Sequence, residues 1–239
     1  MSPTIVLITG SNRGIGRGLL ELYLAKPNHT VIAANRDPKH PTSIELLALP
    51  AAEGTTIKLV KLDMTSPTDA EEAAQILKTQ EGIDHIDILI ANAGIAYIWP
   101  KLEDVLVDDI RKHFETNVLG FVRVYQAFFS FIKAAKDPKW ITIGNAIPFP
   151  NAAYAPTKVV QHWYTKTVAD QEPWLSAFPI DPGFVQTDLG NLGASLLGLE
   201  KATITVEDST RGVLSVIDAS TKATHSGKLW KWTGEEEAW

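Results

Sequence analysis

Residues 4–16 read Thr-Ile-Val-Leu-Ile-Thr-Gly-Ser-Asn-Arg-Gly-Ile-Gly, an apolar run that passes directly into a glycine-rich turn. The run predicts a buried strand over Thr4–Thr9, and the residues after the turn predict a helix over Gly14–Lys26. Many turns contain glycines, but one between a first strand and a first helix lets a pyrophosphate approach the backbone and the helix N–H groups. The segment therefore predicts a dinucleotide site, with these candidate residues: Gly10, Ser11, Asn12, Arg13, Gly14, Ile15 and Gly16.

Apolar strand-like runs and helical patterns alternate along the rest of the chain. The further predicted strands are Thr30–Ala34, Ile57–Lys61, Ile86–Ala91, Lys139–Ile143, Leu175–Ile180 and Lys228–Trp232; the further helices are Thr68–Thr79, Val107–Ala135, Ala153–Asp170 and Val206–Ala219. This alternation predicts an α/β fold, a parallel sheet of seven strands with helices on both faces. With no break in composition, residues 1–239 are expected to form a single doubly wound (Rossmann) domain. Pro179 removes a ladder donor from the sixth strand and predicts a bulge or a strand edge there.

Composition excludes several classes of function. The chain of 239 residues has a formal net charge of −6 and no basic cluster, which argues against a nucleic-acid partner. It has no cysteine, and its six histidines lack metal-ligand spacing with carboxylates, so neither a disulfide nor a metal site is expected. No segment resembles a membrane span or a signal peptide. We therefore expect a soluble, cytoplasmic protein with a small-molecule ligand.

The end of the second predicted strand bears on the choice of cofactor. Enzymes that use NAD place an acidic residue there for the ribose 2′-hydroxyl, whereas this strand ends Ala33-Ala34-Asn35-Arg36. Arg36 can pair with a 2′-phosphate, and Arg13 of the glycine turn can join it. The alternative is that both arginines are ordinary solvated residues. Because both map to the same end of the cofactor, the sequence favours NADP(H).

A tyrosine and a lysine lie four residues apart in the stretch Tyr154-Ala-Pro-Thr-Lys158. On a helix these positions share one face, so Lys158 can hold positive charge beside the phenol. A phenol has a pKa of about 10, and a nearby cation stabilises its phenolate. The pair alone also fits a plain amphipathic helix. Downstream of a dinucleotide turn, it predicts carbonyl chemistry on a nicotinamide.

These motifs, taken in order, resemble the short-chain dehydrogenase/reductase family over essentially the whole chain. The residues that carry the resemblance are the turn Thr9–Gly16, Asp63, Asn92-Ala93-Gly94, Asn117, Tyr154, Lys158, Pro182-Gly183, Val185 and Thr187. Residues 148–154 and 181–190 look most like the fungal ketoreductases of the norsolorinic acid type. In the family, Asp63 matches the acid that contacts the adenine, and residues 182–187 match the loop that closes on the nicotinamide.

The resemblance implies a reaction and roles for the catalytic candidates. NADPH would deliver hydride to a ketone while Tyr154 donates a proton. Lys158 would lower the pKa of the tyrosine and bind the nicotinamide ribose. Asn117 would hold a water that links the lysine to solvent, although an asparagine that kinks or caps its helix is the alternative. A homodimer or homotetramer formed through the two long helices is also implied.

Apolar residues near the expected nicotinamide end predict an apolar substrate, an aromatic or polyketide-type ketone. They are Tyr97, Ile98 and Trp99 on one side, and Phe149, Phe184, Leu189, Leu192, Leu196 and Leu197 on the other. Ordinary core or subunit packing is the alternative for the leucines.

One group that the family uses to hydrogen-bond the substrate carbonyl is missing. The family places a serine just past the fifth strand, but no serine lies between Ser130 and Ser176. By register, Asn145 takes its place, and its amide can donate a hydrogen bond but cannot pass on a proton. Three explanations stay open. Asn145 substitutes in a slower enzyme; the protein has lost catalysis and is a regulatory or structural NADP(H)-binding protein; or the sequence lacks a loop that carries the serine.

Overall fold

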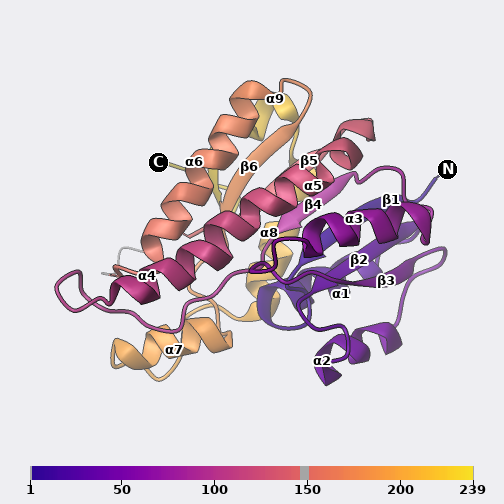
Figure 1. Ribbon diagram of the computed structural model, residues 1–239. Coiled ribbons are helices and arrows are strands. Elements are labelled where there is room, and N and C mark those ends of the chain that lie inside the picture. Colours follow the sequence, from indigo (N-terminus) through magenta and orange to yellow (C-terminus); the bar gives the residue numbers. More distant parts are fainter. Residues whose placement is uncertain (1, 146–150, 239) are drawn as a thin grey trace.

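An eight-stranded sheet runs through the protein in the order β3-β2-β1-β4-β5-β6-β7-β8 (Figure 1). The computed structural model describes residues 2–145 and 151–238. The strands are β1 (Thr4–Thr9), β2 (His29–Asn35), β3 (Thr56–Lys61), β4 (Ile88–Ala91), β5 (Lys139–Ile143), β6 (Ser176–Asp181), β7 (Leu229–Lys231) and β8 (Glu236–Glu237). The pairs from β1 to β7 are parallel, and β8 pairs antiparallel with β7. The predicted seven-stranded parallel sheet is confirmed, and the short β8 extends it.

Helices cover both faces of the sheet. The helices α3 (Asp69–Thr79), α5 (Gly120–Ala134) and α6 (Ala155–Gln171) lie on the face turned to the viewer in Figure 1, and α1 (Gly14–Leu24) and α8 (Val206–Ala219) lie behind it. The short elements are α2 (Pro41–Ile44), η1 (Glu45–Ala48), α4 (Val107–Phe114), η2 (Glu115–Leu119), α7 (Asp188–Leu196) and α9 (Lys222–His225). No helix in the described part of the chain is long and apolar enough to cross a membrane.

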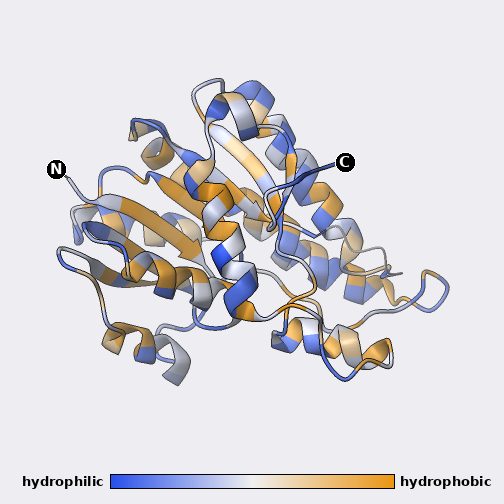
Figure 2. Cartoon of the chain, turned by 180° about the vertical axis from the view of Figure 1, so that it is seen from behind, coloured by the Kyte–Doolittle hydropathy of each residue, from blue (hydrophilic) through white to orange (hydrophobic). Residues whose placement is uncertain are grey.

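Two hydrophobic cores explain why the strands are apolar at successive positions. In β1, Ile5 and Leu7 belong to the core beneath α3 and α5, whereas Val6 and Ile8 belong to the core beneath α1 and α8. Side chains alternate across a strand, so a sheet covered on both sides needs apolar residues at every position. Figure 2 shows these apolar residues concentrated along the strands.

Pro179 lies inside β6, where it pairs in register with Thr142 of β5. On the other side of β6, the register with β7 begins only at Ile180 and continues to Asp181. The proline therefore precedes the β6–β7 ladder, where its missing N–H breaks no strand pairing. Because β6 lies between β5 and β7, Pro179 is not on an edge strand of the sheet, and the predicted bulge stays a prediction.

The predicted long helix over Val107–Ala135 is present, but it contains a turn of π-helix. The π-helical turn η2 joins α4 to α5 and contains Asn117. Such turns interrupt α-helices frequently at functional sites.

The strand order reverses between β1 and β4, which are neighbours in the sheet but not in the sequence. The chain continues from β1 into α1 behind the sheet, and from β4 toward the helices in front of it. In open α/β sheets, ligands bind at such a reversal. The glycine turn after β1 and the Asn92-Ala93-Gly94 segment after β4 meet at this point.

Candidate active site

A cleft of about 800 Å³ lies at the carboxyl ends of the strands. The predicted cofactor and catalytic residues that line it are Gly10, Asn12, Arg13, Gly14, Ile15, Arg36, Asp63, Asn92, Ala93, Gly94, Asn145, Tyr154, Lys158, Pro182, Gly183, Val185 and Thr187. Three other predicted residues, Ser11, Gly16 and Asn117, do not line the cleft but support its wall. The structure therefore brings nearly all of the sequence-predicted site residues to one place.

The glycine turn packs tightly against the segment that follows β4. A Cβ atom at Gly16 would lie 2.4 Å from the Gly10 carbonyl oxygen and 2.5 Å from Asn92 Nδ2, so only glycine fits there. Asn92 Nδ2 donates hydrogen bonds to the carbonyl oxygens of Thr9 (2.9 Å) and Gly10 (3.1 Å). Asn92 thus ties the glycine turn to the segment that follows β4.

Asn35 supports the same turn from the end of β2. It is 1% exposed, and its Oδ1 accepts from the Ser11 main-chain N–H (2.8 Å) and from Ser11 Oγ (3.2 Å). The sequence analysis noted only that the second strand ends without an acidic residue, and it assigned no role to Asn35. Because the amide turns inward, the next residue, the exposed Arg36, lines the cleft. Arg36 and the following residue, Asp37, therefore both line the cleft beyond this buried amide.

Arg13 contacts a residue on the other side of the cleft. Its guanidinium lies 3.1 Å from the carboxylate of Asp188, the first residue of α7, and the two side chains are 71% and 82% exposed. An ion pair this exposed contributes little stability. Arg13 therefore remains available to an anionic ligand.

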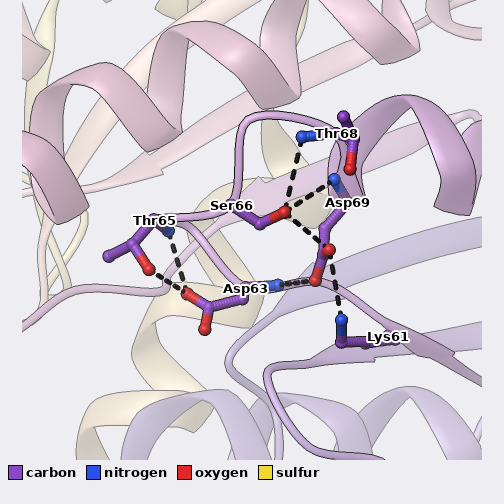
Figure 3. Close-up of polar contacts among 6 residues, drawn as sticks. All are labelled: Lys61, Asp63, Thr65, Ser66, Thr68 and Asp69. Carbon is purple, nitrogen blue, oxygen red and sulfur yellow. Dashed lines mark hydrogen bonds and ion pairs between the residues drawn. The ribbon is translucent and has the colours of Figure 1, made fainter.

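Asp63 reaches the cleft because a buried carboxylate fixes the turn after β3 (Figure 3). Asp69 is 3% exposed and accepts from the Asp63 main-chain N–H (2.9 Å) and from Ser66 Oγ (2.7 Å). Burial alone would raise the pKa of Asp69, but hydrogen bonds from Ser66, Asp63 and Lys61 outweigh it and hold that pKa below its ordinary value. Asp63 itself accepts from the N–H (2.9 Å) and the hydroxyl (2.8 Å) of Thr65. Asp69 was missed in the sequence because its partners become neighbours only when the turn forms.

Tyr154 lies immediately before α6 and is 5% exposed. Burial raises the pKa of its phenol to about 12, and a hydrogen bond with the Asn145 side chain offsets part of that rise. The phenol is therefore protonated at neutral pH, as a proton donor must be. Asn145 follows β5 and lies beside Tyr154, and its predicted role in place of the serine stays a prediction.

Lys158 is 4% exposed, and its Nζ donates to the carbonyl oxygen of Ile143 at 2.8 Å. Burial lowers the pKa of Lys158 to about 8. Its ammonium lies 5.7 Å from the centre of the Tyr154 ring. The sequence predicted that Lys158 lowers the tyrosine pKa, but the pKa of Tyr154 is raised, because burial and the charge of Asp181 raise it and only the hydrogen bond with Asn145 lowers it.

Asn117 joins the loop after β4 to α6. Its side chain exchanges hydrogen bonds with Ile95, accepting from the N–H (2.8 Å) and donating to the carbonyl (3.0 Å). The amide also donates to Thr157 Oγ1 (3.0 Å), and the Asn117 carbonyl accepts from Gln161 Nε2 (2.6 Å). These contacts give Asn117 a structural role at the π-helical turn, while its role in holding a water stays a prediction. Thr157 and Gln161 were not identified from the sequence, because nothing local distinguishes them.

The predicted apolar wall is only partly present. Trp99, Phe184 and Leu189 line the cleft. Three of the predicted leucines, Leu192, Leu196 and Leu197, are exposed and do not line it; Phe149 lies outside the described residues. The expectation that those three leucines face the ligand is therefore wrong for this arrangement, because α7 turns them to its outer surface.

Tyr97 and Ile98, the two residues before Trp99, each contact another part of the chain. Tyr97 donates to Asp109 Oδ1 (2.8 Å) and stacks on His113 at a centroid distance of 4.5 Å. Ile98 is half-buried, and its carbonyl lies 3.5 Å from Asn151 Nδ2. The buried Nε1 of Trp99 has no hydrogen-bond partner among the described residues. Of these three predicted residues, only Trp99 contributes to the cleft wall.

A model of the short chain dehydrogenase family matches residues 4–193. The chain is 36% identical over 235 residues to a norsolorinic acid ketoreductase of Aspergillus parasiticus, covering 94% of this chain and 86% of that protein. It is also 36% identical over 250 residues to a short-chain dehydrogenase of Neurospora crassa, covering 99% and 98%. The NADPH-bound carbonyl reductase from chicken fatty liver has a similar structure, with a TM-score of 0.86, 26% identity and complete coverage of both chains.

Proposed function

This chain belongs to the short chain dehydrogenase family, and we propose on that premise that it is an NADPH-dependent ketoreductase. The observation that carries the proposal is the meeting of Tyr154, Asn145 and Lys158 in one cleft with the glycine turn. A buried, protonated phenol beside an amide donor is suited to the reduction of a carbonyl group.

The cleft residues fit a dinucleotide phosphate. The close approach of Gly16 to the turn leaves the backbone open to a pyrophosphate, and Arg36 supplies positive charge where a 2′-phosphate would bind. Asp63 lines the same cleft and can meet the adenine. The nicotinamide, when bound, supplies the hydride.

The chain's own residues then supply the proton and hold the substrate. Tyr154 donates its phenolic proton to the carbonyl oxygen, which becomes the hydroxyl of the product as hydride adds to the carbonyl carbon. Asn145 donates its amide hydrogen bond to the same oxygen and stabilises the negative charge that develops there. Lys158 places positive charge near the phenolate that is left behind and favours it.

The substrate class that we propose is an apolar, aromatic or polyketide-type ketone. Trp99, Phe184 and Leu189 provide an apolar surface, and an apolar wall with few polar groups binds such molecules. The test is the rate of NADPH consumption by purified protein with a panel of ketones. We expect polycyclic aromatic ketones to be reduced and small charged keto acids to react poorly. The reverse preference would overturn the proposed substrate class.

Arg36 is expected to set the preference for NADPH. Arg36→Ala removes a charged hydrogen-bond donor, and such bonds contribute about 1.5–3 kcal/mol, so the Kd for NADPH should rise roughly 10- to 150-fold. The Kd for NADH should change little. Lys39→Ala, an exposed cation three residues away that does not line the cleft, is the matched control. Equal affinity of the unmodified protein for the two cofactors would contradict this prediction.

The missing serine supports a second candidate function, that of a catalytically impaired NADP(H)-binding protein. Losing one oxyanion donor typically costs about 100- to 1,000-fold in rate, and the Asn145 amide is expected to retain part of that. Asn145→Ser should therefore raise kcat by less than about 100-fold and leave the Kd for NADPH unchanged. A wild-type protein and a serine variant that both bind NADPH but reduce no ketone would favour the binding function. An intact mass above 26.2 kDa would indicate a loop that the sequence lacks.

We also propose that the protein is a homodimer or homotetramer. Val159 and Trp163 lie four residues apart on α6 and are 65% and 63% exposed. A second copy of α6 would bury this apolar face. Light scattering is expected to give a mass of at least twice that of one chain.

A further inference from the structure

Three buried side chains, from the N-cap and one face of α6, lie near the end of β5. Tyr154, Lys158 and His162 are spaced four residues apart and are 5%, 4% and 7% exposed. Residues with this spacing line one face of a helix. The first two belong to the proposed reaction, whereas His162 has so far no assigned role.

His162 contacts the main chain at the position where the missing serine would follow. Its Nε2 accepts a hydrogen bond from the main-chain N–H of Asn145 at 3.2 Å. A Cβ atom at Gly144 would lie only 2.3 Å from the same nitrogen, so the imidazole reaches the backbone because residue 144 is glycine.

The three side chains hold successive residues of the strand end. Lys158 donates to the Ile143 carbonyl at 2.8 Å, His162 accepts from the Asn145 N–H, and Tyr154 shares a hydrogen bond with the Asn145 side chain. The main chain of Asn145 is therefore held by His162, and its side chain lies beside Tyr154.

This contact determines the form of the imidazole. A main-chain N–H can only donate, so Nε2 must be an unprotonated acceptor and the proton of the neutral ring lies on Nδ1. Burial, together with a smaller effect of the nearby charge of Lys158, lowers the pKa of His162 to about 4. The ring is thus neutral at physiological pH, as the contact requires.

We propose that His162 is a positioning residue, which holds the main chain of Asn145 so that its amide reaches both Tyr154 and the substrate carbonyl. The inference rests on the proposed function, because it assigns Asn145 the role of the missing donor. A displacement of about 1 Å at a reacting group can cost roughly 100-fold in rate. An asparagine that has lost its main-chain anchor is free to make such a displacement.

The first test replaces the imidazole acceptor with an apolar side chain of similar size. His162→Leu is expected to lower kcat by about 100-fold and to leave the Kd for NADPH within about twofold. His162→Gln offers an amide oxygen as acceptor and should recover much of the loss. An unchanged kcat in His162→Leu would overturn the proposal.

A double-mutant cycle with Asn145→Ala distinguishes positioning from general support of the fold. If His162 acts through Asn145, His162→Leu should cost less than about threefold in kcat when Asn145 is already alanine. If His162 only stabilises the helix or the strand, the loss should be the same in both backgrounds, and the proposal would be wrong.

A measurement without turnover separates this inference from the proposed function. Hydrogen exchange of the Asn145 amide, followed in protein labelled with ¹⁵N-asparagine, should accelerate by up to about tenfold in His162→Leu. A wild-type protein that reduces no ketone would contradict the proposed function, while faster exchange would still support the anchoring of Asn145. Unchanged exchange would overturn that anchoring whatever the activity.

Discussion

Tyr154→Phe is expected to lower ketone reduction by about 100- to 10,000-fold, the range over which a positioned proton donor accelerates a reaction. The change removes only the hydroxyl of a side chain that is 5% exposed, so the ring still fills its place beneath the cleft. NADPH affinity should remain nearly the same. Initial rates of NADPH oxidation and a fluorescence titration with NADPH measure the two quantities.

Tyr164→Phe is the matched control for this experiment. Tyr164 lies on the same helix, is 38% exposed and does not line the cleft, so the same chemical change there should leave kcat unaltered. Full activity of Tyr154→Phe would refute the assignment of Tyr154 as the proton donor. A large loss of NADPH affinity would show that the phenol serves mainly in binding.

Lys158→Met is expected to have opposite effects on activity and stability. Turnover should fall at least 100-fold, because the charge that favours the tyrosine phenolate is gone. The protein without cofactor should become more stable at pH 7. The pKa of Lys158 is lowered from 10.5 to about 8, so burial destabilises the ammonium form by about 3 kcal/mol. Subtracting about 1 kcal/mol for the lost hydrogen bond to Ile143 leaves a gain of about 2 kcal/mol.

Thermal unfolding without cofactor measures that gain. For a chain of this length, about 2 kcal/mol corresponds to a rise in Tm of roughly 4–8 °C. Between pH 8 and 10.5 the unfolded chain binds more protons at this lysine than the folded protein does, so wild-type stability at this site increases with pH. The difference between methionine variant and wild type should therefore shrink across that window. A methionine variant that is less stable at pH 7 would contradict the prediction.

The sheet and the course of the cofactor cleft were predictable because their signals are local. The residues of Thr4–Thr9 and the glycines that follow are contiguous, and each further strand is a short apolar run of its own. The reversal of strand order brings the ends of these runs together without help from any single side chain. By contrast, β8 consists of two glutamates, which is too short to show a period.

The supporting side chains could not be predicted, because each acquires its role from a distant partner. Asn35 meets Ser11 across 24 positions, and His162 meets Asn145 across 17. The upward shift of the Tyr154 pKa depends on burial, which the spacing of Tyr154 and Lys158 does not reveal. Apolar composition also did not distinguish Leu189, which lines the cleft, from Leu196, which is 57% exposed.

The short strand β8 covers the outer edge of β7. It pairs with β7 along the edge that would otherwise present free N–H and carbonyl groups, and its two residues are Glu236 and Glu237. Glu236 lies 2.8 Å from the ammonium of Lys228, and Glu237 lies 3.4 Å from that of Lys231. Short, charged edge strands are poor templates for strands of another molecule. Sheet-to-sheet aggregation is therefore disfavoured at this border of the sheet.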